Sequence, residues 1–437
     1  MKTVSKRVIF YFVLYCFICF YILIISPFTA NDTWNYGFSY GLIRGEMFYK
    51  DFNMVIGPFY PLLMAFPLLF SNTYLSFILF HGIWMVFFYY LLEKNYSFRS
   101  FLAFLLMLFF PSLMGVSYNT FMLLCIVLLI TLEKSQWNKK DFFIGCILSI
   151  GYFTKQSTGF LLFLPTIIFW KKVNWKQRLL GFLLPSCFLI GFLVWKNAFL
   201  EYLSFCFLGL LEFGSHNTSF DWIPFLLFLG IVICSIYLFW KKRDNISLLY
   251  YGMGYSLCLP ILDSLHLFYG ILLFLLFLFE VGYFSSFSKK QLLPFCVLMI
   301  GILGIEGSFL FTDDSKYPHT IHPFEYRYFT KEEKTSIQEM KLYLKDKEFV
   351  LFSDQNYFYK IILQKPIGFL DIVNYGNSGY HGTERLLNEI QKHPDIVYLL
   401  PKNASIYKQL DQDCMNYVIS NASKTGEVGE YEIYEFR

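Results

Sequence analysis

Apolar residues occur in long blocks from the N-terminus to about residue 311, and polar residues are confined to the short segments between these blocks. A block of about 20 apolar residues can cross the hydrocarbon core of a bilayer as a helix. The blocks predict about eleven transmembrane helices, near residues 8–28, 73–92, 100–115, 119–132, 141–153, 158–170, 179–196, 222–240, 246–261, 266–284 and 291–311. Several of them between 119 and 170 are short for a full crossing, which indicates broken or half-buried helices.

Two apolar runs need a separate interpretation. The run over residues 58–70 contains three prolines, so it predicts a re-entrant or interfacial segment instead of a crossing helix. The first block follows Lys2, Lys6 and Arg7, as in a signal peptide, but it is long enough to span and no small-residue cleavage site follows it. We therefore predict an uncleaved first span.

The polar pattern from residue 312 to 437 predicts a small α/β domain after the membrane domain of residues 1–311. Thr330 and Glu333 form a capping box that starts a helix with one apolar face. A second helix is predicted over residues 384–393. The predicted strands cover residues 348–355, 395–400 and 431–436. The glycines between residues 374 and 384 lack the lysine and spacing of a phosphate loop, so they are interpreted as turn residues.

Composition and cysteine usage agree with a membrane protein. The chain is 56% hydrophobic and only 16% charged, whereas a soluble domain carries about 25% charged residues. Its basic residues form no continuous face, which argues against a nucleic-acid partner. Nine of the ten cysteines lie in apolar runs, so the sequence predicts no disulfide framework.

The distribution of cations predicts the orientation. With the N-terminus in the cytoplasm, the cytoplasmic segments contain seventeen Lys and Arg residues, and the opposite short loops contain four. Positively charged loops stay in the cytoplasm. The chain is therefore predicted to be a multi-pass membrane protein, with the first outer loop (residues 29–60) and the C-terminal domain both extracytoplasmic.

Asp32 is the first candidate catalytic residue, because it follows the end of the first span almost directly. A carboxylate at this depth could meet a lipid-borne substrate, and partial desolvation would raise its pKa toward that of a general base. The alternative is an ordinary helix-end residue that caps the next segment. Lys50 and Asp51 follow in the same loop, where they could contact a phosphate or a metal, or could simply be solvated.

A second group of candidates lies among the later apolar segments. Lys155 is the one cation in its outer segment, and a boundary lysine is costly enough to suggest a function such as phosphate binding. Asp263 and His266 are three residues apart, so on a helix the carboxylate could orient the imidazole. A polar turn between helices is the alternative. The outer loop over residues 196–221 adds Glu201, Glu212 and His216, whose spacing is not that of a zinc site, so a divalent metal is left open.

Taken together, these motifs resemble those of the GT-C glycosyltransferases. Residues 45–58 read GEMFYKDFNMVIGP, a G-x-x-x-Y-x-D-F…GP pattern that follows an Asp just outside the first span. The pattern is most similar to the branch with protein O-mannosyltransferases and bacterial aminoarabinose transferases. The TKQSTG segment at Lys155 and the D-x-x-H motif at Asp263 are similar to patterns in bacterial members. The resemblance covers residues 1–311 as a fold and is specific over about 30–61.

The resemblance implies an enzyme that moves a sugar from a polyprenyl-phosphate donor to an extracytoplasmic polysaccharide, teichoic acid, lipid or protein. Asp32 holds the position of the family's general base. Lys50 or Asp51 would correspond to the family's residues near the donor phosphate. The Asp-Glu pair common in the family is Asp32-Thr33 here, which weakens the case for a metal at this point. Two other functions remain: a polysaccharide polymerase or ligase, and a flippase or transporter of lipid-linked oligosaccharide, which often has repeated halves.

Overall fold

The computed structural model describes residues 2–25, 30–96, 115–216, 222–242, 245–259, 261–283, 316–318, 321–325, 327–402 and 410–436. The predicted helix over 291–311, nearly all of the one over 100–115, and the predicted domain boundary near residue 312 lie outside these residues. The chain forms two compact units. Unit 1 comprises Met1–Pro27, Ile78–Leu189 and Ser219–Asp314, and unit 2 comprises Phe28–Phe77, Ile190–Thr218 and Ser315–Arg437.

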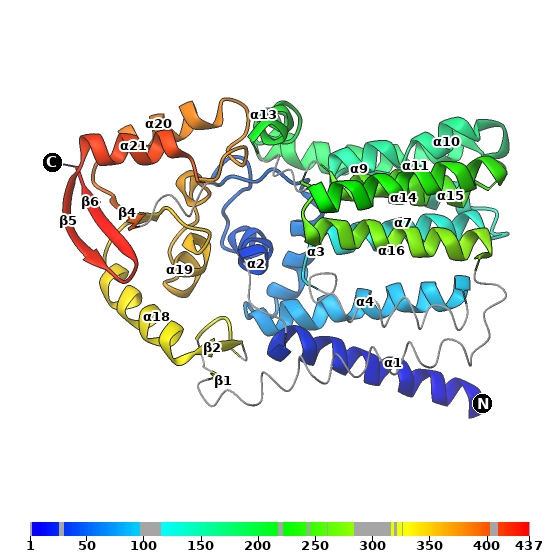
Figure 1. Cartoon of the computed structure of the whole chain (residues 1–437), viewed down its shortest axis with the longest axis horizontal. Helices are drawn as coiled ribbons and strands as arrows, with labels where there is room; N and C mark the ends of the chain where they lie inside the picture. The colour runs from blue at the N-terminus through cyan, green and yellow to red at the C-terminus, as the bar shows by residue number, and fades with distance from the viewer. Residues whose placement is uncertain are drawn as a thin grey trace. The chain divides into compact units, whose positions relative to one another are not determined.

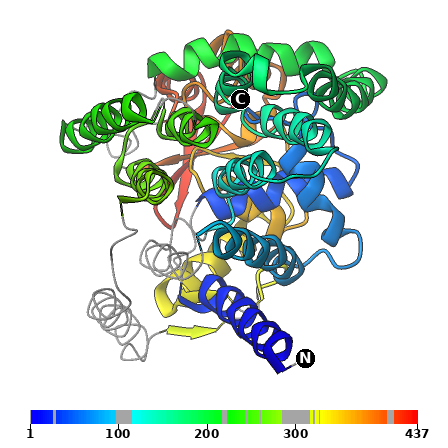
Figure 2. The same cartoon turned by 90° about the vertical axis from the view of Figure 1, so that its right-hand side faces the viewer.

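Unit 1 is helical, and its helices from α7 to α16 run roughly along one direction (Figures 1 and 2). Short 3₁₀ segments, η2 (Trp170–Lys172) and η4 (Tyr255–Cys258), follow α10 and α15. The helices are α1 (Lys2–Phe20), continued by a π-helical turn over Tyr21–Ile25, α4 (Tyr74–Tyr96), α7 (Tyr118–Glu133), α8 (Lys140–Tyr152), α9 (Gln156–Leu161), α10 (Leu164–Ile168), α11 (Trp175–Trp195), α14 (Trp222–Lys241), α15 (Ile246–Gly254) and α16 (Ser264–Val281). The first residues of α4 and the last of α11 belong to unit 2.

Four helices in the described part of the chain are long and apolar enough to cross a membrane: Lys6–Leu23, Tyr74–Tyr96, Trp175–Trp195 and Trp222–Lys241. They confirm four of the predicted spans as helices. The predicted span at 158–170 is broken into α9 and α10, as its length suggested. On α14, Ile223, Leu226 and Ile236 are each more than half exposed, which suits a helix that faces lipid.

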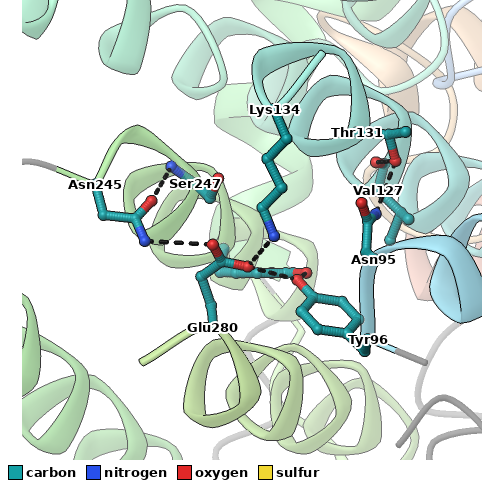
Figure 3. Close-up of polar contacts among 9 residues, drawn as sticks. Asn95, Tyr96, Val127, Thr131, Lys134, Asn245, Ser247 and Glu280 are labelled. Carbon is teal, nitrogen blue, oxygen red and sulfur yellow. Dashed lines mark hydrogen bonds and ion pairs between the residues drawn. The ribbon is translucent and has the colours of Figure 1, made fainter. Parts of the chain in front are cut away.

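A polar network joins the ends of several helices in unit 1 (Figure 3). The Glu280 carboxylate, at the end of α16, accepts hydrogen bonds from the Lys134 ammonium at 2.5 Å and the Tyr96 hydroxyl at 2.9 Å. Its other oxygen accepts from the Asn245 side chain at 3.3 Å. The network ties α4, α7 and α16 to the segment before α15. It satisfies a carboxylate whose side chain is only 7% exposed.

A second polar cluster surrounds Arg178, in the first turn of α11. Its guanidinium lies 2.6 Å from Asp141 at the start of α8 and 2.6 Å from Glu133 at the end of α7. It also donates to the Thr166 hydroxyl at 3.0 Å. Arg178 is 2% exposed, so a cation that contributes to the predicted cytoplasmic charge is in fact buried among helix ends. We interpret this cluster as structural.

Unit 2 contains two helices from the first outer loop, α2 (Ala30–Ile43) and α3 (Phe59–Leu68). The sequence analysis did not predict α2. The helix is fixed by packing: Tyr36, Phe38 and Tyr40 are buried, and a Cβ atom on Gly37 would lie 2.4 Å from the ring of Tyr357. Because α2 has no simple apolar stripe, its periodicity gave no signal. The short helix α3 agrees with the prediction that 58–70 is no full crossing.

The C-terminal segment forms a four-stranded sheet in the order β3-β4-β6-β5, with β3 and β4 parallel and the other pairs antiparallel. Figure 1 labels β4, β5 and β6 of this sheet. Val350, Leu386, Leu400 and Met415 contribute to its core. The strands are β3 (Phe349–Leu351), β4 (Val397–Pro401), β5 (Ser423–Val428) and β6 (Tyr431–Glu435), and the helices are α18 (Lys331–Leu344), α19 (Asn356–Ile362), α20 (Gly382–Lys392) and α21 (Gln412–Asn421). A separate antiparallel pair is formed by β1 (Lys316–Pro318) and β2 (Tyr328–Thr330). The two predicted helices and the three predicted strands are present, but β3 covers only 349–351 of the predicted 348–355.

The outer-loop segments of unit 2 are bonded to its C-terminal segment. The Asn53 side chain donates to the carbonyl oxygens of Phe369 at 2.6 Å and Ile372 at 3.3 Å. The Glu46 carboxylate accepts from the Ile367 amide at 3.3 Å. Burial raises the pKa of Glu46, but the hydrogen bond to Ile367 works in the opposite direction.

The loop after α11 makes similar bonds through α12 (Phe199–Leu203), a π-helical turn over Ser204–Leu208, and α13 (Gly209–His216). Arg385 pairs with Glu201 at 2.7 Å, and Glu212 accepts from the amide of His381 at 2.7 Å, directly before α20. These bonds hold together three segments that the charge distribution predicts on one side of the membrane: residues 29–60, 196–221 and the C-terminal domain. Their placement on the outer side of the membrane stays a prediction.

Candidate active site

Asp32 lies in the first turn of α2, where the helix dipole favours a negative charge. Its side chain is buried, with the residue 6% exposed. The Tyr74 hydroxyl, at the start of α4, donates a hydrogen bond to its Oδ1 atom at 3.0 Å. A solvated helix-end carboxylate was the alternative in the sequence analysis, and the burial of Asp32 argues against it.

An aromatic cluster surrounds the Asp32–Tyr74 pair. The ring of Tyr36 makes edge contacts with Tyr74, Phe77 and Phe324, at centroid distances of 5.6, 5.4 and 5.3 Å. The amide of Tyr74 donates to the carbonyl of Pro323 at 2.9 Å. Edge-to-face packing of this kind stabilises beyond simple burial. The cluster therefore fixes the position of the hydroxyl that contacts Asp32.

Arg327 is a third member of this group that the sequence analysis missed. It is 2% exposed, and its guanidinium carbon lies 6.0 Å from the centroid of the Tyr74 ring. Both Asp32 and Arg327 interact electrostatically with the Tyr74 hydroxyl. The only sequence signal was an arginine in an aromatic stretch, EYRYF, shortly after the last predicted span.

Lys50 and Asp51 are exposed, in a tight turn of the first outer loop. The Asp51 carboxylate accepts from the amide of Met47 at 2.7 Å and so closes the turn. The structure thus gives Asp51 a local role in holding the turn and leaves Lys50 accessible to solvent.

Lys155 lies in the connection between α8 and α9. Its ammonium donates to the Asn119 side-chain oxygen and to the Leu257 carbonyl, both at 3.1 Å. Both acceptors are uncharged, and burial lowers the pKa of Lys155 to about 8. A half-buried cation held by neutral oxygens keeps its charge available for an anionic ligand.

Asp263 is the N-cap of α16 and binds His266 twice, as the spacing predicted. Its Oδ1 atom accepts from the His266 amide at 2.7 Å and lies 2.8 Å from the His266 Nδ1 atom. The Cys258 thiol contacts the His266 carbonyl at 3.2 Å, next to the Leu257 carbonyl that binds Lys155. Unit 1 therefore brings Lys155, Asp263 and His266 together around Leu257 and Cys258.

The two described carboxylates of the 196–221 loop, Glu201 and Glu212, bind groups in the C-terminal segment. Glu201 pairs with Arg385, and Glu212 binds the amides at the start of α20. Among the described residues, no group of three or more His, Cys, Asp and Glu side chains is arranged to hold a metal ion.

Over nearly its full length, the chain shares its fold with two solved structures of ArnT. It matches the crystal structure of ArnT from Cupriavidus metallidurans in the apo state with a TM-score of 0.58 at 8% sequence identity, over 99% of this chain and 98% of that chain. The structure of ArnT from the same organism bound to undecaprenyl phosphate matches with a TM-score of 0.60 at 10% identity, over 98% of each chain. No family model and no curated protein matches the sequence. At these identities the likeness establishes the fold alone.

Proposed function

We propose that this protein is a membrane glycosyltransferase that moves a sugar from a polyprenyl-phosphate donor to an acceptor on the extracytoplasmic side. The observation that carries the proposal is the fold match to ArnT over nearly the full length of both chains, in one case to a structure that holds undecaprenyl phosphate. A buried carboxylate directly after the first span supports the same conclusion.

In the proposed reaction Asp32 is the general base. It takes the proton of the acceptor hydroxyl while that oxygen attacks the anomeric carbon. The bond from this carbon to the donor phosphate breaks, and the polyprenyl phosphate leaves with the bonding electron pair. One displacement of this kind inverts the anomeric configuration. The burial of Asp32 and its hydrogen bond from Tyr74 support the role, because both restrict the carboxylate to one arrangement.

Lys155 and His266 are proposed to bind the donor phosphate, with Asp263 orienting the imidazole. A cation near the leaving phosphate stabilises the charge that develops on it. The 2.8 Å contact between Asp263 and the Nδ1 atom directs the other ring nitrogen of His266 away from the carboxylate. Lys50 and Asp51 remain proposed contacts of the donor, with Asp51 also closing the turn that carries Lys50.

The proposed setting is the plasma membrane, with the N-terminus in the cytoplasm and the predicted C-terminal α/β domain outside. The acceptor is proposed to be a surface polysaccharide, a teichoic acid, a lipid or a protein. The bonds from Arg385 to Glu201 and from Asn53 to Phe369 join the C-terminal segment to the outer loops. They support a role for that segment in covering the site or recognising the acceptor.

The proposal can be tested by lipid binding to the purified protein. Native mass spectrometry would compare undecaprenyl phosphate with undecaprenol, which has the same chain but no phosphate. We expect retention of the phosphate lipid and loss of this preference in Lys155→Met. As a matched control, Lys139→Met removes an exposed lysine from a predicted cytoplasmic loop. Equal retention of the two lipids by the wild type would contradict a site for the phosphate.

The same assay has an expected pH dependence. Lys155 is charged below its pKa of about 8, so the affinity for undecaprenyl phosphate should fall as the pH rises through 8. One pH unit above the pKa about a tenth of the lysine remains protonated, and the affinity should be about tenfold lower than at pH 7. Lys155→Arg keeps its charge throughout this range and should bind with little change between pH 7 and 9. A parallel loss in both proteins would assign the titration to another group.

A further inference from the structure

Asp32 is supported by residues from a distant part of the chain. Its hydrogen-bond donor Tyr74 begins α4, and the cation beside Tyr74 is Arg327, which follows the last predicted span. We propose that Arg327 is a positioning residue for Asp32 that acts through Tyr74, so that the C-terminal segment completes the catalytic centre. This inference rests on the proposed function, in which Asp32 is the base.

Charge compensation is the first reason to assign Arg327 a role at Asp32. Taking an isolated carboxylate out of water is costly, and in proteins such a group is protonated unless a cation or several donors stabilise it. Asp32 is 6% exposed, and the Tyr74 hydroxyl that contacts it carries no charge. Arg327 is 2% exposed and remains protonated at any physiological pH. Arg327 therefore places a positive charge beside the ring whose hydroxyl contacts Asp32.

Geometry is the second reason. The guanidinium carbon of Arg327 lies 6.0 Å from the Tyr74 ring centroid, within the range of a cation–π interaction. Such a contact fixes the ring as well as compensating charge. An arginine suits this position because its planar group stacks on aromatic rings, whereas a lysine ammonium does so as a point charge.

The backbone around Arg327 is fixed to the same cluster. The Arg327 amide donates to the carbonyl of Phe324 at 3.2 Å, and the Phe324 ring packs on Tyr36 and Tyr74. The neighbouring carbonyl of Pro323 accepts from the Tyr74 amide. Pro323, Phe324 and Arg327 therefore hold Tyr74 by its backbone and its ring. A small displacement of these residues would move the hydroxyl that orients Asp32.

The test compares variants of the full-length protein in lipid, with kcat and KM measured for transfer from the donor. Tyr74→Phe removes one oxygen atom and should lower kcat about tenfold with the donor KM unchanged. Arg327→Met should lower kcat about 100-fold, the size of effect expected when a catalytic group is misplaced by about 1 Å. Arg327→Lys keeps the charge and should recover part of the loss. Tyr357→Phe is the matched control: Tyr357 is buried against α2, and its hydroxyl has no hydrogen-bond partner within the described residues.

The outcomes separate this inference from the proposed function. Thermal unfolding of each variant reports on folding, and Tyr74→Phe keeps the test valid if Arg327→Met does not fold. If Asp32→Asn is inactive while Tyr74→Phe and Arg327→Met retain the kcat of Tyr357→Phe, the positioning role is overturned and the base remains. A lower kcat that Arg327→Lys partly restores, at constant KM, supports the role. Full activity of Asp32→Asn would overturn the proposed function itself.

Discussion

Asp32→Asn is expected to lower kcat for sugar transfer by about 10²–10⁴-fold, the usual contribution of a general base. The amide has the shape of the carboxylate and still presents an oxygen to the Tyr74 hydroxyl, so the local packing is preserved. It cannot take a proton from the acceptor, so the chemical step loses its base. Donor binding should be nearly unchanged, because the proposed phosphate contacts lie elsewhere in the chain.

The measurement is single-turnover release of polyprenyl phosphate from labelled donor, with the protein in lipid at wild-type levels. Asp346→Asn is a suitable control, since this carboxylate is exposed in the C-terminal segment and has no assigned role. It should react at the wild-type rate. A rate for Asp32→Asn within twofold of the control would remove Asp32 as the base.

Arg178→Met is expected to destabilise the folded protein by about 3–5 kcal/mol, the usual effect of removing one partner from a buried ion pair. Arg178 is 2% exposed and lies 2.6 Å from both Glu133 and Asp141. Methionine fills much of the same volume but leaves two carboxylates close together without their cation. The loss should appear as a lower unfolding temperature in detergent and a lower yield in the membrane.

Two further variants show whether the loss of stability in Arg178→Met comes from charge or from packing. Lys176→Met removes an exposed cation two residues earlier in the same helix and should leave the unfolding temperature unchanged. Combining Arg178→Met with Glu133→Gln and Asp141→Asn removes the uncompensated charges and should restore most of the lost stability. If the triple variant is as unstable as Arg178→Met alone, the contribution of Arg178 is packing instead of charge.

The fold was largely predictable because hydropathy and periodicity are local properties. Apolar blocks located helices such as α14, a short apolar run located β4, and period-2 alternation located β6. Spacing alone predicted that Asp263 orients His266, since residues three apart share a helix face. Each of these predictions depends only on residues that are close together in the sequence.

The remainder of the candidate site depends on contacts between distant segments. Tertiary packing brings Tyr74 to Asp32 and Arg327 to Tyr74, and no local pattern marks an arginine as the partner of one particular aromatic ring. The burial of Arg178 could not be predicted for the same reason. A cation at the end of an apolar block has the same sequence pattern whether it is solvated or buried. The helix α2 was missed because packing against Tyr357, more than periodicity, fixes it.

The most direct measurement of the central claim uses purified protein in liposomes, offered a panel of radiolabelled polyprenyl-phosphate sugars beside the Asp32→Asn variant. We predict that one donor loses its label to an acceptor or to water with the wild type only, and that polyprenyl phosphate is released in equal amount. If no donor is consumed and the labelled lipid instead changes leaflet, the protein is a lipid transporter and the account of it as a glycosyltransferase is wrong.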